Sequence, residues 1–292
     1  MPSLRDIRRQ IKSVKSTEQI TRAMKMVAAA RMRRSQTAIL AARPFALKME
    51  SMVGDLAAEA PQDPGNRFFQ ARPDGPVGLV VVTSDKGLCG AFNAGVLRAA
   101  LEWLREDYKG RPVCLALVGR KGRDFLRRVA APNVEIVTEM AGVFPRVGFH
   151  HAEILGRTLI DTYFKKGLSR WDVVYNEFKS VTQQRLVGVT LMPVKEVSLA
   201  QSLTGPASFS YEPDKARLLD ALLPRHIKAQ LFRILLESQA AELAARMNAM
   251  DAASTNAREL RETLNIQANR QRQGMITKEI AELVGGAEAL AA

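Results

Sequence analysis

The chain has 292 residues, of which 47% are apolar, so it can bury one core and still have length left for an extended element. Its two cysteines, Cys89 and Cys114, are too few for a disulfide framework and lack the paired spacing of a zinc site. The sequence contains neither an apolar signal-peptide region nor a run of about 18 apolar residues. We therefore expect a protein of a reducing compartment, with the cytoplasm favoured, that is neither exported by an ordinary signal nor membrane-spanning.

Positive charge is concentrated near the N-terminus. The formal net charge is +13, and residues 1–48 carry twelve Lys and Arg against only Asp6 and Glu18. Such an excess suits an acidic partner, which could be nucleic acid, an anionic membrane or an acidic protein surface. No aromatic residue alternates with the basic ones to form a stacking platform, so an acidic protein is favoured over nucleic acid.

Residues 3–58 are predicted to form one long helix. Between Pro2 and Pro44 there is no glycine or proline, and good helix formers dominate. Pro44 is expected to kink the helix without ending it, because the helical pattern continues to Pro61. At about 1.5 Å per residue the helix would span roughly 80 Å. Its apolar seam starts with coiled-coil spacing and resumes out of step, at Leu4, Ile7, Ile11 and Val14 and then at Ile20, Met24 and Val27.

The middle of the chain is predicted to be a small, mostly parallel α/β domain. A segment rich in Pro, Gly and Asp, 61–76, separates it from the first helix. Apolar β-branched runs then alternate with helical stretches, which is typical of a parallel sheet covered on both faces, and the last two runs are close enough to form a hairpin. The predicted strands are 77–83, 113–118, 134–137, 172–178 and 186–194, and the predicted helices are 91–107, 121–130 and 150–166.

A second long helix is predicted over residues 214–284, with a length of roughly 105 Å. After Pro224 there is no proline, and before Gly285 the only glycine is Gly274. Its predicted seam is apolar at both ends and small in the middle, where two helices could approach closely. The seam residues are Leu231, Ile234, Leu235, Ser238, Ala241, Ala245, Ala249, Ala252, Ile276, Ile280 and Leu283. Because neither long helix can bury its stripe alone, we expect an antiparallel coiled coil in which the last turns of the C-terminal helix project beyond the partner helix.

The predicted fold class is therefore α/β plus a long α-helical coiled coil. The N- and C-terminal helices form the antiparallel coiled coil, and a mostly parallel, Rossmann-like α/β domain lies between them in sequence. The predicted domains are an N-terminal coiled-coil helix, 1–60, a central α/β domain, 61–212, and a C-terminal coiled-coil helix, 213–292.

Two glycine-containing turns follow predicted strands, where backbone N–H groups could hold an anion. The turn TSDKGLCGAFN, 83–93, places Gly87 and Gly90 before a helix, and GRKG, 119–122, follows the second strand. Neither matches the phosphate-binding GxxxxGK[ST] loop or GxGxxG. A structural strand-to-helix turn is therefore favoured over a nucleotide site.

The candidates for catalysis and metal binding are weak. A Cys89 nucleophile would need a base, and no histidine is close to it in sequence, so a buried thiol is favoured. The adjacent His150 and His151 lack the i, i+4 spacing of a helical metal site, and we interpret them as a surface pair at a helix N-terminus. We predict no catalytic residue, no bound cofactor and no metal ion.

Three long stretches resemble the ATP synthase gamma subunit family, in the same order as in that family. They are LRDIRRQIKSVKSTEQITRAMKMVAAARMRRSQ (4–36), TSDKGLCGAFN (83–93) and SQAAELAARMNAMDAASTNARELRETLNIQANRQRQGMITKEIAELVGGAEAL (238–290). The segments 61–75 and 199–210 match least. The resemblance implies a non-catalytic central stalk, which couples rotation of a membrane c-ring to conformational change at the catalytic sites of the beta subunits of a proton-translocating ATP synthase.

The resemblance also implies partners and contact residues. The coiled coil would lie in the channel of a hexamer of three alpha and three beta subunits, and the α/β domain would rest on the c-ring beside an epsilon subunit, at the cytoplasmic face of a bacterial inner membrane. The implied hexamer contacts are Met24, Lys25, Arg246, Arg272, Gln273, Thr277, Glu279 and Glu282. The implied contacts with the c-ring and epsilon are Phe209 and Tyr211. From the residues alone, Ile276, Ile280 and Leu283 are more simply interpreted as helix-seam packing.

Two other functions stay open at this point. An enzyme with a nucleotide at Gly87–Gly90 would bind nucleotide with micromolar affinity, which we do not expect. A nucleic-acid binder using residues 5–34 would lose duplex binding steeply as salt rises.

Overall fold

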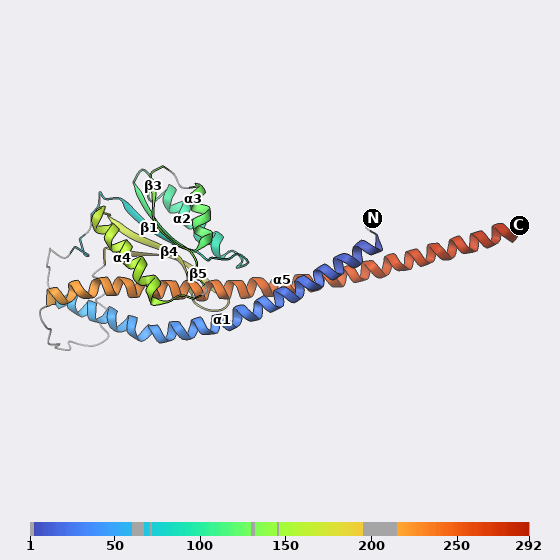
Figure 1. Cartoon of the computed structure of the whole chain (residues 1–292), viewed down its shortest axis with the longest axis horizontal. Helices are drawn as coiled ribbons and strands as arrows, with labels where there is room; N and C mark the ends of the chain where they lie inside the picture. The colour runs from blue at the N-terminus through green and yellow to red at the C-terminus, as the bar shows by residue number, and fades with distance from the viewer. Residues whose placement is uncertain are drawn as a thin grey trace. The chain divides into compact units, whose positions relative to one another are not determined.

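The structure is a computed structural model, and it describes residues 3–59, 67–70, 72–129, 132–144, 146–194 and 215–291. A 56-residue helix near the N-terminus and a 77-residue helix near the C-terminus flank an alternation of strands and shorter helices (Figure 1). The predicted combination of an α/β domain with two long helices is confirmed. Among the described helices, none combines the length and the apolar content needed to span a bilayer.

Spatial contacts divide the chain into two compact units. The first unit combines Met1–Ala28 with Met247–Ala292, and the second is Ala29–Arg246. Both units contain parts of the two long helices, whereas the predicted boundaries near residues 60 and 212 follow sequence order. Those two boundaries lie outside the described residues, so the predicted division into domains stays a prediction.

The second unit is built on a five-stranded sheet in the order β3-β2-β1-β4-β5. The strands are β1 (Val77–Val82), β2 (Val113–Val118), β3 (Val134–Met140), β4 (Arg170–Phe178) and β5 (Gln184–Met192). The first four run parallel, and β4 and β5 form the predicted antiparallel hairpin. Every residue of β1 and β2 is buried, which is why these central strands read as continuous apolar runs rather than as alternating ones.

Helices cover both faces of this sheet (Figure 1). On one face, α2 (Phe92–Arg105) and α3 (Arg120–Val129) share a core with Leu79, Val81 and Leu115. On the other face, α4 (Phe149–Lys165) packs with the second-unit parts of the long helices α1 (Leu4–Glu59) and α5 (Lys215–Ala291). The predicted Rossmann-like layering is thus confirmed, and one of its outer layers is supplied by the long helices.

Both long helices continue through residues that often end helices. α1 contains Pro44, as predicted, and α5 contains Pro224. The prediction that the second helix ends at residue 284 is wrong, because α5 continues through Gly285 and Gly286 to Ala291. Glycine costs an exposed helix only about 1 kcal/mol, which is not enough to force an end.

The long helices run antiparallel in the first unit, as predicted. Lys25 Nζ lies 2.6 Å from Asp251 Oδ1, and Arg261 NH1 lies 3.3 Å from Glu18 Oε2. Since the α1 number falls as the α5 number rises, the two helices must point in opposite directions. In the second unit the same helices meet through a buried hydrogen bond, which the Ser35 hydroxyl donates to Gln239 Oε1 at 3.2 Å.

The seam of α1 differs from the predicted one. Ile7 is buried as predicted, but Ile20 and Val27 are 57% and 52% exposed, and one set of buried positions on each helix keeps a spacing of seven residues or a multiple of seven. These positions are Ile7, Thr21, Ala28 and Ser35 on α1, and Leu236, Leu243, Met250, Ala257 and Leu264 on α5. The prediction followed the large apolar residues, but on α1 the seam uses the small or polar residues Thr21, Ala28 and Ser35.

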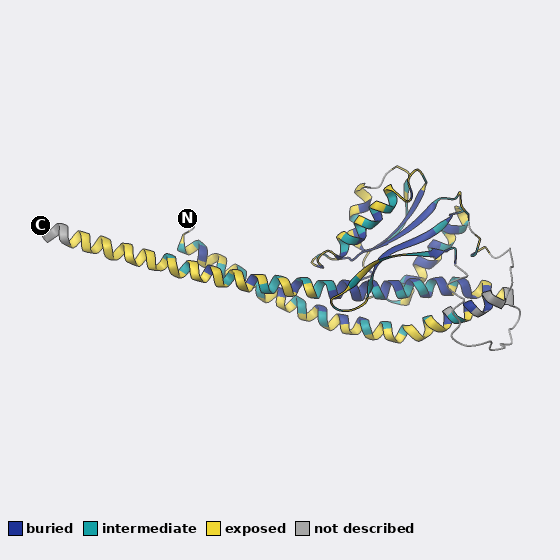
Figure 2. Cartoon of the chain, turned by 180° about the vertical axis from the view of Figure 1, so that it is seen from behind, coloured by how far each residue is buried: buried dark blue, intermediate teal, exposed yellow. Residues whose placement is uncertain are grey.

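The predicted seam of α5 is correct only in part. Leu231, Ile234, Leu235, Ser238 and Ala241 are buried, while Ala252 is exposed. The prediction that Ile276, Ile280 and Leu283 pack within the chain is also wrong, since these side chains are 47%, 55% and 73% exposed. As predicted, the last turns of α5 continue beyond the N-terminal end of α1 as a single exposed helix (Figure 2).

Candidate functional site

The segment that leads from the carboxyl end of β1 into the start of α2, Thr83–Asn93, is held by its own side chains. The Ser84 amide donates to Asn93 Oδ1 at 2.9 Å, and the Ser84 hydroxyl donates to the Lys86 carbonyl oxygen at 2.6 Å. Asn93 Nδ2 donates to Cys89 Sγ at 3.2 Å. Within this frame Leu88 has a φ of +63°, a left-handed conformation that is rare for a residue with a large side chain. Side-chain hydrogen bonds therefore hold this loop in place, and its backbone is strained at Leu88.

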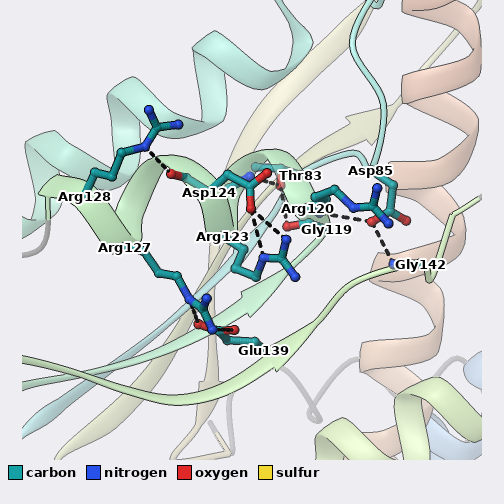
Figure 3. Close-up of polar contacts among 11 residues, drawn as sticks. Thr83, Asp85, Gly119, Arg120, Arg123, Asp124, Arg127, Arg128, Glu139 and Gly142 are labelled. Carbon is teal, nitrogen blue, oxygen red and sulfur yellow. Dashed lines mark hydrogen bonds and ion pairs between the residues drawn. The ribbon is translucent and has the colours of Figure 1, made fainter.

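Asp85 occupies the position at which an anion could bind. Its Oδ1 accepts hydrogen bonds from the amides of Arg120 and Gly142 at 3.0 and 2.8 Å (Figure 3). Its Oδ2 accepts one from the amide of Phe144 at 2.9 Å. The N-terminus of α3 thus receives its negative charge from within the chain. The GRKG turn is therefore a structural strand-to-helix connection, in agreement with the favoured interpretation.

Helix α5 closes over the other side of the loop. Cys89 and Phe92 form a buried cluster with Ala241 of α5, and the partly buried Phe178 and Ala245 pack against it. In open α/β sheets, ligands commonly bind outside the carboxyl ends of the strands, where the strand order reverses. Here β1 and β4 flank that point, and the long helix α5 packs against the loop that follows β1. Gly87 and Gly90 thus belong to a helix-packing loop, in agreement with the structural interpretation of this turn.

Two charged side chains of α5 complete the contact with the loop. Arg246 NH2 donates to the carbonyl oxygens of Lys86 and Gly87 at 3.3 and 3.1 Å, and it forms an ion pair with Glu242. The side chains of Arg246 and Glu242 are only 13% and 4% exposed. Burial raises the pKa of Glu242 to about 7, although Arg246 opposes the shift.

The cysteine and histidine chemistry matches the structural interpretation. Burial raises the pKa of the Cys89 thiol, opposite to the shift that activates a nucleophilic cysteine. His150 and His151 lie at the start of α4, where His151 Nδ1 accepts a hydrogen bond from the Gly148 amide at 3.0 Å. Over the described ranges, no group of three or more His, Cys, Asp or Glu is arranged to hold a metal ion.

The predicted contact residues fall into separate groups. Lys25 forms an ion pair with Asp251, and the residue before it, Met24, is partly buried. Arg246 is buried against the loop of the α/β domain and lies in the other unit. The remaining α5 residues of the set are all exposed near the end of the helix: Arg272, Gln273, Thr277, Glu279 and Glu282. Phe209 and Tyr211 lie outside the described residues.

The exposed end of α5 carries an apolar surface. Its members are Met275, Ile276, Ile280, Leu283 and Val284, each between 47% and 73% exposed. The sequence interpretation had assigned three of them, Ile276, Ile280 and Leu283, to packing within the chain. On α1, Ile20, Met26 and Val27 add exposed apolar side chains among exposed cations such as Arg22. Exposed apolar surface of this extent marks an interaction surface. The only sequence signal for it was that these residues continue the apolar pattern beyond the length that α1 can cover.

Comparisons with known proteins agree on one family. Residues 3–290 match the ATP synthase family. The chain is 46% identical to the ATP synthase gamma chain of Elusimicrobium minutum, over 99% of both chains. It is 42% identical to that of Chlorobium phaeobacteroides, also over 99% of both chains.

Solved structures give the same result. A chain from the central stalk and c-ring of the Tetrahymena thermophila mitochondrial ATP synthase has a TM-score of 0.60 at 25% identity, covering 80% of this chain and 99% of that one. A chain of the Euglena gracilis mitochondrial ATP synthase has a TM-score of 0.68 at 18% identity, over 98% of this chain and 94% of that one, and supports the fold alone. The chain therefore belongs to the ATP synthase gamma chain family, the non-catalytic central stalk subunits of ATP synthases.

Proposed function

We propose that this chain is the rotor shaft of a proton-translocating ATP synthase at the cytoplasmic face of a bacterial inner membrane, which it reaches only through its partners. The paired helices lie in the channel of a hexamer of three alpha and three beta subunits. The α/β domain rests on the c-ring beside an epsilon subunit. The chain itself holds no cofactor and performs no catalytic step, and nucleic acid is not among its partners.

The observation that carries this proposal is the exposed apolar end of α5. A single helix that exposes Ile276, Ile280 and Leu283 gains stability when a partner surface surrounds it, because the apolar area then leaves water. A ring of subunits with an apolar inner surface would bury all sides of the helix and still let it turn. Nucleic acid would not bury this surface.

A further set of side chains on the two long helices provides the contacts that change with rotation. We assign them to Met24 and Lys25 on α1, and on α5 to Arg246, Arg272, Gln273, Thr277, Glu279 and Glu282. Arg246 can take part only with the small fraction of its side chain that is exposed. The exposed cations of α1 favour an acidic protein surface as their partner. Phe209 and Tyr211 are proposed contacts with the c-ring and epsilon.

Asymmetry explains how such a shaft acts on chemistry that occurs elsewhere. The single pair of helices presents a different side to each of three identical catalytic subunits. Each subunit therefore meets a different set of contacts, and the populations of its open and closed states shift according to the difference in contact free energy. Rotation driven by the c-ring passes these contacts from one subunit to the next.

Native mass spectrometry tests the assembly directly. The chain would carry an affinity tag in the 61–75 loop, and the complex would be purified from detergent-solubilised membranes. We expect one copy of this chain with three copies each of two nucleotide-binding subunits. Recovery of the tagged chain alone, or with nucleic acid, would refute the proposal.

A further inference from the structure

Arg246 is among the proposed hexamer contacts, but most of its side chain is engaged within its own chain. Its guanidinium meets two carbonyl oxygens of the loop, at Lys86 and Gly87, and the carboxylate of Glu242 one helical turn earlier. An ion pair placed four residues apart on a helix is common, but here both side chains are largely buried. The buried guanidinium is matched by a buried carboxylate and by carbonyl acceptors, as a stable buried charge requires.

The loop next to these carbonyls needs such support. Leu88 follows Gly87 directly, has a φ of +63° and is 62% exposed, so neither a favoured backbone conformation nor burial of its side chain keeps it in place. A strained residue persists only where its surroundings fix it. On one side of Leu88 the Arg246 contacts fix the two preceding carbonyls, and on the other side Cys89 is buried against Ala241.

We propose that Arg246, held in position by Glu242, is a positioning residue that fixes the Lys86–Cys89 turn of the α/β domain to α5. We call the contacts of Arg246 with Glu242, Lys86 and Gly87 the clip. The clip lies at the end of the second unit, whose last residue is Arg246. A loop that in other α/β proteins stays open for a ligand is used here to fix the domain to its own shaft helix. The clip rests on contacts within the chain. Only its mechanical consequence, transmission of torque from the domain to α5, rests on the proposed function.

The two cysteines provide a test of the clip within the full chain. Cys89, the last residue of the turn, is 2% exposed, and Cys114 is 4% exposed in β2, so iodoacetamide labels each thiol only when its surroundings open. Peptide mass spectrometry measures the two labelling rates in the same sample. Arg246→Gln is expected to raise the rate at Cys89 at least about tenfold, since it removes charge-assisted hydrogen bonds, while the rate at Cys114 stays unchanged.

Matched variants decide the outcome. Arg225→Gln changes an exposed arginine of the same helix and unit, and it is expected to leave both rates within about twofold of the unmodified chain. Arg246→Lys keeps the charge without the planar fork, and Cys89 should then be labelled more slowly than in Arg246→Gln. Unchanged labelling of Cys89 in Arg246→Gln, or equal acceleration at Cys89 and Cys114, would overturn the proposal. Equal acceleration would mean that Arg246 supports the whole fold rather than the turn.

The mechanical consequence has a separate readout. In the assembled complex in proteoliposomes, Arg246→Gln should lower the ratio of ATP-driven proton pumping to ATP hydrolysis, and Arg246→Lys should restore part of it. An unchanged ratio together with faster labelling of Cys89 would leave the clip in place and refute its role in torque. Failure of the chain to assemble with a hexamer would refute the proposed function without affecting the labelling result.

Discussion

At the scale of single residues, Gly119 shows how closely the segments that follow β1 and β2 approach each other. Gly119 has a φ of +92°, and a Cβ atom there would overlap the carbonyl oxygen of Thr83. Gly119 directly precedes α3, and the amide of Arg120, the first residue of α3, donates a hydrogen bond to Asp85. Both the positive φ and the lack of space for a Cβ atom require glycine at this position.

Gly119→Ala should therefore lower the free energy of unfolding by at least about 2 kcal/mol, because it adds both a backbone penalty and an overlap with fixed backbone. Gly110→Ala is the matched control. Gly110 also has a positive φ, of +76°, but an added Cβ would meet nothing within 4 Å, so we expect a loss of only about 1 kcal/mol. Urea unfolding followed by the fluorescence of Trp103 and Trp171 measures both, and equal losses would contradict the overlap.

The titration of Glu242 gives a prediction for pH. Arg246 is on its own helix, Asp85, Lys86 and Cys89 face it from the loop, and Arg31 faces it from α1. Burial raises the pKa of Glu242 from 4.5 in the unfolded chain to about 7 in the folded one. The stability associated with this group is therefore fully present below pH 4.5 and is lost as the pH rises through about 7.

Between pH 5 and pH 8, we expect the unmodified chain to lose about 2–3 kcal/mol more stability than Glu242→Gln, which cannot titrate. The comparison concerns the change with pH, since the variant also weakens the contact with Arg246 at every pH. Urea unfolding at a series of pH values measures it. Parallel pH profiles for the two proteins would show that the buried carboxyl titrates near its ordinary pKa.

At the scale of elements, the coiled-coil seam shows what periodicity in a sequence can and cannot predict. Large apolar residues led to a predicted seam that changed step near Ile20, whereas the buried stripe of α1 keeps its heptad spacing through Thr21 and Ala28. Small seam residues bury little apolar area themselves, so a hydrophobicity pattern gives them little weight. They become the seam because they allow the two backbones to approach.

Ala257 tests this at one position of the first unit. Ala257→Leu should destabilise the helix pair by about 1–3 kcal/mol, because the added side chain must enter a closely packed seam. Ala252→Leu, on the exposed side of the same helix, should change stability by less than about 0.5 kcal/mol. Thermal unfolding followed by circular dichroism at 222 nm compares them, and a similar effect of both substitutions would rule out close packing at Ala257.

At the scale of the whole molecule, the exposed apolar surface near the end of α5 separates the stability of the chain from its function. Ile276, Ile280 and Leu283 are exposed, so their side chains contribute little to the stability of the isolated chain. In the proposed assembly the same side chains are surrounded by the hexamer. A substitution there should therefore leave the stability of the isolated chain unchanged and lower the activity of the complex.

The triple variant Ile276→Ser, Ile280→Ser and Leu283→Ser should leave the unfolding of the second unit unchanged. It should lower the ATP synthesis rate of the assembled complex several-fold, because about 1 kcal/mol or more of apolar contact is lost at each position. Glu262→Gln, an exposed change on the same helix, is the control and should leave the rate unchanged. A normal synthesis rate in the triple variant would show that this surface does not bear on the hexamer.

The sequence by itself determined those features that depend on local pattern. Uninterrupted helix formers gave two long helices, and continuous apolar β-branched runs gave strands buried on both faces, such as β1 and β2. The long matched stretches at both ends and at residues 83–93 indicated the family. The polar residues near the end of α5 were singled out only because the resemblance implied them as contacts.

The tertiary structure alone decided which surfaces meet. Ile20 and Ile276 have the same character as buried seam residues, and only the position of the partner helix shows that they are exposed. Likewise, Arg246 resembles any other arginine of a basic chain until the loop of the α/β domain is placed against α5. Local periodicity fixes the conformation of a segment, whereas burial depends on contacts between residues far apart in the chain, such as Gly87 and Arg246.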